Sequence, residues 1–595
     1  QAVTEAGLPY KIWQDILPYL LLLSDIADDE ASILAIILPN ISALLEREIK
    51  KTTLPASTVK TRLPILITNL MLEAAKTKPL LIMFEDLQWA SDSIEILKQA
   101  INAIDGHPVM IVGNYRSDEA PHLADELQSM SRIQLERLSE EDIEKLSAAM
   151  LGDNGNAPGV VDLIHRESEG NAFFIVEVVR ALADEVGQLS NIGLATLPAQ
   201  VFAGGIQKII NRRLAKLPEW ALHPVQISSI IGRRIQPDLM KQILPELNVE
   251  KWITICGEVA IFSAMGIEWE FTHDKIREFV IADLESDVAR TMNLQVAEAI
   301  ETLYADKLSD YAAMLSNYYY EGGKVEKESH YAAIAAEALR ELNAPEAMRF
   351  AKRAIKLESY QYADDRERAF AALHLTYGQL GLRLSEFDQA KESFDRALDT
   401  YKQLDDTDGI ALAKNSIGEW GLITGKFKIA EENLNASLPV LKDYKGDPML
   451  YAHANMNMAV VQNRLGNTEV AFQHNVTCFE IAKRVGDEIT IAKSLNNLAI
   501  LKDMAGDWDE ALEMHNQALE IRRRLKDRAG IASSLINMAA IEGDKENFDI
   551  QKSYLLEAIP NSRAVGQKRS EAYALRMLGD VETGTGNRDA AISYY

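Results

Sequence analysis

The stretch LNNLAILKDMAGDWDEALEMHNQAL, residues 495–519, contains two helix-like patterns separated by Gly506 and Asp507. One side of each pattern carries Leu495, Leu498, Ala499, Trp508, Ala511, Leu512, His515, Ala518 and Leu519. These intervals of three and four residues are typical of amphipathic helices, and a glycine between two such patterns marks a turn. The stretch therefore predicts two helices joined by a short turn. We assign the rings of Trp508 and His515 to packing between such helices.

The same unit recurs along the second half of the chain. Gly-polar-x-x-x-Ala segments are offset by 41, 40 and 80 residues, and the longest interval spans one degenerate copy at residues 546–551. The intact copies are 425–430, 466–471, 506–511 and 586–591, and residues 387–390 extend the series upstream. Because one helical pair cannot bury its apolar face alone, neighbouring pairs must stack. The repeats therefore predict an α-solenoid.

This unit resembles the tetratricopeptide repeat in its longer form, and the resemblance covers roughly residues 330–595. In that family the first helix of each pair lines the concave side, where Asn457, Asn497 and Asn537 recur at steps of 40 residues. Spaced carboxamides can hydrogen-bond to the backbone of an extended peptide, so the implied partner is a protein or peptide. Contacts between neighbouring repeats would also explain the ladder, and both interpretations stay open.

The first half of the chain predicts an α/β arrangement. An unbroken apolar run, Leu80 to Phe84, ends in Glu85 and Asp86, and a helix-like segment follows it. A second apolar run at 109–112 ends near Arg116. Strand, helix and strand in this order are typical of a parallel sheet covered on both faces, with functional groups at the carboxyl ends of the strands.

Glu85 and Asp86 are candidate ligands of a magnesium ion beside a nucleotide phosphate. A buried strand that ends in two adjacent carboxylates is costly unless the carboxylates meet a cation. A pair of acids solvated in a loop is the alternative. The surrounding sequence, LLIMFEDLQWA at 80–90, resembles the Walker B segment of STAND-type ATPases, the signalling branch of the AAA-related P-loop proteins. The resemblance implies that Glu85 and Asp86 bind Mg²⁺ and orient the attacking water.

Further segments resemble the same family in the same order. IVGNYRSDE, residues 111–119, is similar to its sensor strand, which implies that Arg116 reaches the terminal phosphate of ATP. An ordinary surface cation is the alternative. The planar fork of arginine suits this task because it donates two hydrogen bonds to phosphate oxygens.

Two later segments belong to this series. EGNAFF at 169–174 resembles the family's Gly-Asn-Pro-Phe-Phe turn and implies nucleotide contacts at Gly170 and Asn171, although Ala172 stands where proline is usual. FTHD at 271–274 resembles an element of the winged-helix domain, whose histidine, here His273, senses the phosphate of ADP. A structural histidine paired with aspartate is the alternative.

One expected motif is absent from the sequence. No Gly-x-x-x-x-Gly-Lys-[Ser/Thr] loop occurs, although such a loop would cradle the phosphates. The chain also begins without methionine and stops inside a helix-like segment, so we expect a piece of a longer protein, with a degenerate family member as the alternative. Such a piece should bind nucleotide weakly and hydrolyse little or none.

The resemblance implies five parts in chain order. They are a partial P-loop ATPase core at 1–135, a helical lid at 136–199, a winged-helix-like domain at 200–290, a helical adapter at 291–345 and the tetratricopeptide array at 346–595.

Composition excludes several classes of protein. The formal charge of −27 leaves no excess of cations for a general nucleic-acid-binding surface. Cys256 and Cys478 lie far apart without a histidine pair at zinc spacing, which argues against disulfides and structural zinc. The apolar stretch at 16–23 is too short for a membrane span. We expect a cytoplasmic protein. Arg522, Arg523 and Arg524 are expected on a solvated helix face.

The functional hypothesis is a signalling switch that binds ATP or ADP with Mg²⁺, senses a protein partner on the repeats, and self-associates in the ATP state. A non-catalytic interaction scaffold is the first alternative. The second is the regulatory part of a larger class III adenylate or guanylate cyclase, because domains of that kind often accompany this half.

Overall fold

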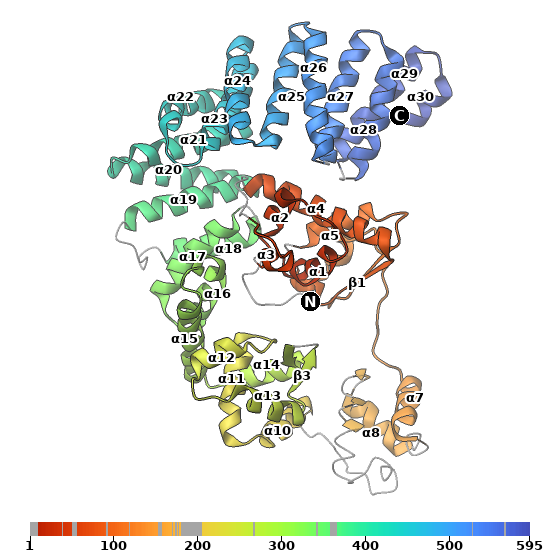
Figure 1. The fold of residues 1–595 in the computed structure, drawn as a ribbon, viewed down its shortest axis with the longest axis vertical. Coiled ribbons are helices and arrows are strands. Elements are labelled where there is room, and N and C mark those ends of the chain that lie inside the picture. Colours follow the sequence, from red (N-terminus) through yellow and green to blue (C-terminus); the bar gives the residue numbers. More distant parts are fainter. Residues whose placement is uncertain are drawn as a thin grey trace. The chain divides into compact units, whose positions relative to one another are not determined.

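The computed structural model (Figure 1) describes residues 10–38, 40–49, 56–90, 93–117, 119–152, 158–168, 170–172, 175–176, 178–179, 205–265, 268–340, 343–357, 366–525, 527–564 and 567–595. The chain divides into two compact units. One contains residues 1–130, 309–316 and 325–595, and the other contains residues 131–308 and 317–324.

The first 130 residues contain the predicted strand–helix–strand segment. Strand β1 (Leu80–Phe84) pairs in parallel with β2 (Val109–Gly113), in a register that runs from Leu80 opposite Val109 to Phe84 opposite Gly113. Helix α5 (Ile94–Ala103) connects them. The other elements are α1 (Lys11–Leu21), α2 (Asp28–Leu34), α3 (Ile41–Leu44), α4 (Ala56–Thr77), the 3₁₀ turn η1 (Leu87–Trp89) and α6 (Leu123–Glu126).

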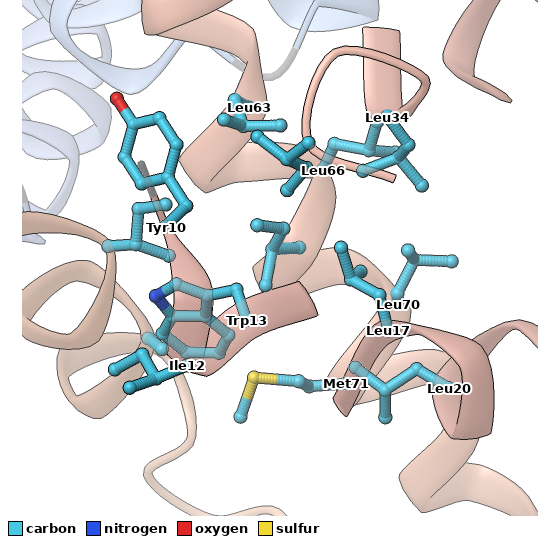
Figure 2. Close-up of a cluster of buried hydrophobic side chains, with 14 of the residues drawn as sticks. Tyr10, Ile12, Trp13, Leu17, Leu20, Leu34, Leu63, Leu66, Leu70 and Met71 are labelled. Carbon is cyan, nitrogen blue, oxygen red and sulfur yellow. The ribbon is translucent and has the colours of Figure 1, made fainter. Parts of the chain in front are cut away.

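Trp13 lies at the centre of the core beneath this sheet. It is fully buried, and its ring meets that of Phe84 edge to face at 5.1 Å. Figure 2 shows Trp13 in one apolar cluster with Ile12, Leu17 and Met71. The indole nitrogen donates to the backbone oxygen of Ser93 at 3.3 Å. Phe84, and with it the end of β1, is therefore anchored by aromatic packing.

The opposite face of the sheet differs from the prediction that both faces are covered. Leu81, Met83 and Met110 are 62–63% exposed and Val112 is 37% exposed, whereas Ile82 and Phe84 are buried. Successive side chains of a strand point to opposite faces, so these four form one apolar surface. Its exposure shows that no described element packs against this side of the two strands.

The second unit is mostly helical. Helices α7 (Glu140–Leu151) and α8 (Pro158–Ser168) share a small core. The antiparallel strands β3 (Phe262–Met265) and β4 (Glu268–Phe271) pack against α13 (Val249–Glu258) and α14 (Asp274–Ala282), respectively. The other helices of this part are α10 (Gly205–Ala215), α11 (Glu219–Ile231), α12 (Pro237–Ile243) and α15 (Ser286–Leu303). The two strands pair from Phe262 opposite Phe271 to Met265 opposite Glu268. Edge-to-face contacts join Trp252 to Phe262 and Phe262 to Phe271.

Helical pairs form the second half of the chain, as predicted, and follow one another in chain order in Figure 1. After α16 (Leu308–Glu321), they are α17 (Val325–Leu339) with α18 (Ala344–Lys356), α19 (Arg366–Arg383) with α20 (Phe387–Gln403), α21 (Thr407–Ile423) with α22 (Phe427–Asp443), α23 (Pro448–Arg464) with α24 (Thr468–Val485), α25 (Glu488–Met504) with α26 (Trp508–Arg524), α27 (Arg528–Asp544) with α28 (Phe548–Ala564), and α29 (Lys568–Gly584) with α30 (Arg588–Tyr594).

The turn inside each pair explains the repeating glycine. Gly466, Gly506 and Gly586 have φ of 83–88°, in the left-handed region where a side chain is strained. The next residue's N–H donates to the carbonyl five residues earlier, for example from Asp507 to Lys502 at 2.9 Å. This is the Schellman closure of a helix end. Glu546 takes the same conformation at φ 60°, which confirms the degenerate copy.

Candidate functional site

The candidate site lies where β1 and β2 end. Beyond the strands, the N–H of Asn114 donates to the oxygen of Phe84 and the N–H of Leu87 donates to the oxygen of Asn114, both at 2.9 Å. Asp86 has φ 58° and ψ 45°, an unusual conformation for a non-glycine residue. Its N–H donates to Asn114 Oδ1 at 2.9 Å. Hydrogen bonds from one strand end therefore hold the backbone of the other.

A chain of polar side chains connects the two strand ends. Gln88 Nε2 donates to Asp86 Oδ1 at 3.3 Å, and Gln88 Oε1 accepts from the N–H of Arg116 at 3.1 Å. The guanidinium of Arg116 donates to Glu119 Oε1 at 2.9 Å, and both side chains are about one-third exposed. Glu85 is exposed. The structure thus brings Asp86 and the backbone of Arg116 to one edge of the sheet.

Gln88 and Asn114 organise this edge and were not predicted as site residues. Only their position in the sequence could have indicated a role at the site, because Asn114 directly follows β2 and Gln88 lies two residues after Asp86. Only the pairing of the strands shows that Gln88 bonds to both sides. A side chain that uses its amide as donor and acceptor at once fixes the spacing between the groups it joins.

The acids fit one part of a magnesium–nucleotide site. Magnesium is usually held by one or two carboxylates together with phosphate oxygens and water, rather than by an all-protein cage. Glu85 and Asp86 supply that number of carboxylates at a strand end. Across the described residues, no group of three or more His, Cys, Asp or Glu could hold a metal ion. Two carboxylates at a strand end are a donor set that suits an ion shared with a ligand.

Gly170 and Asn171 lie in the second unit. Gly170 is buried with φ 77°, its oxygen accepts from the N–H of Leu138 at 2.8 Å, and its N–H donates to Ser168 Oγ at 3.3 Å. The half-buried Asn171 donates its N–H to the oxygen of Ser168 at 2.9 Å. The predicted turn is therefore present and packs against the segment before α7. Glu169, Phe173 and Phe174, which complete the motif, lie outside the described residues.

Replacement of Gly170 by alanine is expected to destabilise this turn strongly. A Cβ at Gly170 would lie 2.6 Å from the oxygen of Leu138, in addition to the strain of positive φ. We expect a loss of about 3 kcal/mol. Gly323→Ala is the control, because φ is 68° there and the nearest neighbour lies at 3.5 Å. Hydrogen exchange of residues 138–151 should rise in the first variant alone; equal protection in both would contradict the assignment.

His273 precedes helix α14 and caps it. Its Nδ1 accepts from the N–H of Lys275 at 3.0 Å, and the ring is half-buried. The carboxylate of the neighbouring Asp274 is paired with Arg233 rather than solvated. Both the sensing role and the structural role remain compatible with this geometry. Glu85, Asp86 and Arg116 belong to the first unit, whereas Gly170, Asn171 and His273 belong to the second.

Two of the three repeat asparagines hydrogen-bond to neighbouring helices. Asn537 Nδ2 donates to Asn496 Oδ1 at 3.2 Å, and Asn497 Nδ2 donates to Asn475 Oδ1 at 3.4 Å. Asn457, Asn497 and Asn537 are all half-buried. These bonds favour the interpretation that the ladder joins adjacent helices. A carboxamide has a second N–H and an oxygen, so peptide binding stays compatible with the structure.

Arg522 corrects the prediction that all three consecutive arginines lie on a solvated face. Arg522 is only 6% exposed, and its Nη1 donates to Ser534 Oγ at 2.6 Å and to the oxygen of Gly530 at 2.9 Å. Arg523 and Arg524 are exposed and pair with Glu557 and Glu488. Consecutive residues of a helix point in different directions, so Arg522 faces the neighbouring repeat while the other two arginines face solvent.

His515 and Trp508, whose rings were both assigned to packing, differ in burial. His515 is fully buried, which confirms its assignment to the core. Trp508, the first residue of α26, is 37% exposed, so it is only partly buried. Among the described residues, no helix combines the length and apolar character that crossing a bilayer requires.

Known proteins resemble the chain in part. Residues 450–524 match the tetratricopeptide repeat family. No curated protein matches the chain. A solved STAND (signal transduction ATPase with numerous domains) protein with a tetratricopeptide repeat sensor, from Pyrococcus horikoshii, is similar with 13% identity and a TM-score of 0.45, over 89% of this chain and 82% of that one.

Two further solved structures are similar over smaller shares of the chain. The apo form of the quorum sensor NprR from B. thuringiensis shares 14% identity over 54% of this chain and 91% of its own, with a TM-score of 0.38. Aspartyl phosphate phosphatase F from Bacillus subtilis shares 12% identity over 69% of this chain and 94% of its own, with a TM-score of 0.35. Likeness at this level assigns no function to the chain.

Proposed function

We propose that the chain is part of a nucleotide-dependent signalling switch of the STAND type. ATP or ADP with Mg²⁺ would bind at the ends of β1 and β2, and the repeats would bind a protein or peptide. The observation that supports this proposal is the hydrogen-bonded chain from Asp86 through Gln88 to Arg116, which links the carboxylate of Asp86 to the backbone N–H of Arg116 at the neighbouring strand end. Catalytic groups in parallel sheets are typically found at this edge.

The chain's own residues have distinct tasks in this proposal. Glu85 and Asp86 would hold Mg²⁺, which on binding would neutralise phosphate charge, and Glu85 is exposed enough to position a water. Arg116 must exchange Glu119 for a phosphate oxygen, since its guanidinium now pairs with that acid. An exposed pair of this kind is worth only about 0.2–1 kcal/mol, so the exchange costs little.

The second unit would contribute the lid and the sensing elements. Gly170 and Asn171 lie on a turn fixed by Ser168 and Leu138, and His273 caps α14 after the β3–β4 hairpin, an arrangement that supports the winged-helix assignment. With ADP, these elements would keep the site closed. A partner on the repeats would favour the open ATP state. To shift the ratio of open to closed molecules from 1:99 to 99:1, the partner must bind the open state more tightly by about 5.5 kcal/mol.

A non-catalytic scaffold is the second candidate. It is favoured by the repeat match at residues 450–524 and by the absence of a phosphate-binding loop from the sequence. In this case the repeats alone would bind protein, and the acids at the strand ends would be solvated loop residues. The two candidates differ in one measurable property, which is nucleotide affinity that depends on Mg²⁺.

Nucleotide binding is tested by titrating the chain with a fluorescent ATP analogue, with and without Mg²⁺. The Glu85→Gln, Asp86→Asn double variant should weaken Mg²⁺-dependent binding at least tenfold, because both ion ligands lose their charge. The control is Glu95→Gln with Glu126→Gln. These acids pair with Lys98 in the same unit, and their replacement changes the net charge equally. Equal affinities in both variants, or no binding by the unmodified chain, would favour the scaffold.

A further inference from the structure

The turn that carries His273 is anchored by a segment far away in the sequence. Residues 233–235 follow α11 and pair with β4: the N–H of Phe271 donates to the oxygen of Arg233 at 3.0 Å, and the N–H of Ile235 donates to the oxygen of Trp269 at 2.8 Å. These bonds fix the backbone of Arg233 beside the end of β4.

The guanidinium of Arg233 bridges two acids on either side of this turn. Nη2 lies 3.0 Å from Glu270 Oε1, and Nη1 lies 3.2 Å from Asp274 Oδ2. Glu270 is on β4 and Asp274 is the first residue of α14, so the bridge spans both ends of the Thr272–His273 turn. The side chains of the arginine and the two acids are only 10–19% exposed. At such burial, losing one partner leaves the others uncompensated.

The geometry of this turn determines which ring nitrogen of His273 carries the proton. Because Nδ1 accepts from the N–H of Lys275, the neutral ring carries its proton on Nε2. Nε2 is then a hydrogen-bond donor, and donors are what phosphate oxygens require. This state depends on the position of the ring at the start of α14, which the Arg233 bridge helps to fix.

We infer that Arg233 is the positioning residue of His273: by bridging Glu270 and Asp274 it holds the turn in which His273 Nδ1 accepts from the N–H of Lys275 and the ring takes the Nε2–H tautomer. That this tautomer serves an anionic group, a nucleotide phosphate, rests on the proposed function. Arg233 itself needs no contact with the ligand. Its neighbour Arg234 pairs with Glu268 at 3.1 Å on a more exposed surface and provides a matched comparison.

The positioning role is tested in the full chain by NMR of selectively labelled histidines, with the His273 signal assigned from a His273→Gln variant. The unmodified chain and Arg234→Gln should show His273 in the Nε2–H tautomer. Arg233→Gln should give signals averaged between the two tautomers. Arg233→Lys, which keeps the charge, should restore the Nε2–H tautomer in part. Circular dichroism shows whether each variant remains folded. A His273 signal in Arg233→Gln identical to that of the unmodified chain would overturn the inference.

A second arm addresses the ligand. If the anion is a phosphate, ADP affinity should fall several-fold in His273→Gln and in Arg233→Gln, and the double variant should be no weaker than either one. Additive losses would contradict action of Arg233 through His273. Should the unmodified chain fail to bind ADP, the proposed function fails, while the tautomer result still decides whether Arg233 positions His273.

Discussion

Arg522→Met should destabilise the repeats around α25–α27, whereas Arg523→Met should leave them nearly unchanged. The methionine retains the apolar stem of Arg522 but removes its hydrogen bonds to Ser534 Oγ and to the oxygen of Gly530. A hydrogen bond that involves a charged group contributes about 1.5–3 kcal/mol, so we expect a total loss of about 2–4 kcal/mol. Burial lowers the pKa of Arg522 and the charge of Asp527 opposes this shift, and the guanidinium remains a cation at neutral pH.

This prediction is checked by urea unfolding combined with hydrogen exchange. Peptides covering 528–540 should lose protection in Arg522→Met and retain it in Arg523→Met, because Arg523 only pairs with Glu557 on the surface. Similar protection in the two variants would show that the buried network contributes nothing to the contact between these repeats.

Acidification should destabilise the repeats through two buried histidines. His374 and His515 are 2% and 0% exposed, and neither ring nitrogen of either residue has a hydrogen-bond partner. Burial lowers the pKa of each ring to about 4, with smaller contributions from Arg396 beside His374 and from Arg522 beside His515. The neutral rings are therefore strongly favoured in the folded state.

The sign of the pH effect follows from proton counting. An unfolded histidine titrates near pH 6.5, so between pH 6.5 and 4 the unfolded chain binds more protons than the folded chain. Stability should fall as pH decreases through this window, by about 3 kcal/mol per histidine at most. The expected loss is fully developed only near pH 4.

The matched variants are His515→Leu and His374→Leu, with the exposed His107→Leu as control. Unfolding free energies measured from pH 7 to 4.5 should fall less steeply in the two buried variants than in the control, because leucine binds no proton. Parallel pH profiles in all three would contradict the assignment. Arg522→Met should also raise the pKa of His515, since it removes a nearby positive charge.

The repeats could be predicted from the sequence because their constraints are local. A helix end closed by a residue with positive φ favours glycine, and the close approach of two helices favours alanine. Both constraints therefore produce a periodic pattern in the sequence. The glycine pattern does not mark every turn, because Glu546 forms the same turn without glycine. The degenerate copy was recognisable only from the spacing of its neighbours.

Long-range contacts could not be predicted in the same way. The burial of Arg522 depends on its direction toward the next repeat, which three consecutive arginines do not reveal. The link from Asp86 to Arg116 through Gln88 requires the register of β1 and β2. The exposed apolar face with Leu81 and Met110 likewise appears only once the neighbours of the sheet are known.

The central claim, that Glu85 and Asp86 hold a metal ion shared with a nucleotide, is tested most directly by a crystal structure of the chain with Mn²⁺ and a non-hydrolysable ATP analogue. The proposal predicts an anomalous peak within coordination distance of both a carboxylate at 85–86 and a phosphate oxygen, with Arg116 turned from Glu119 toward the terminal phosphate. Metal and nucleotide bound elsewhere, with the Arg116–Glu119 pair intact, would contradict it.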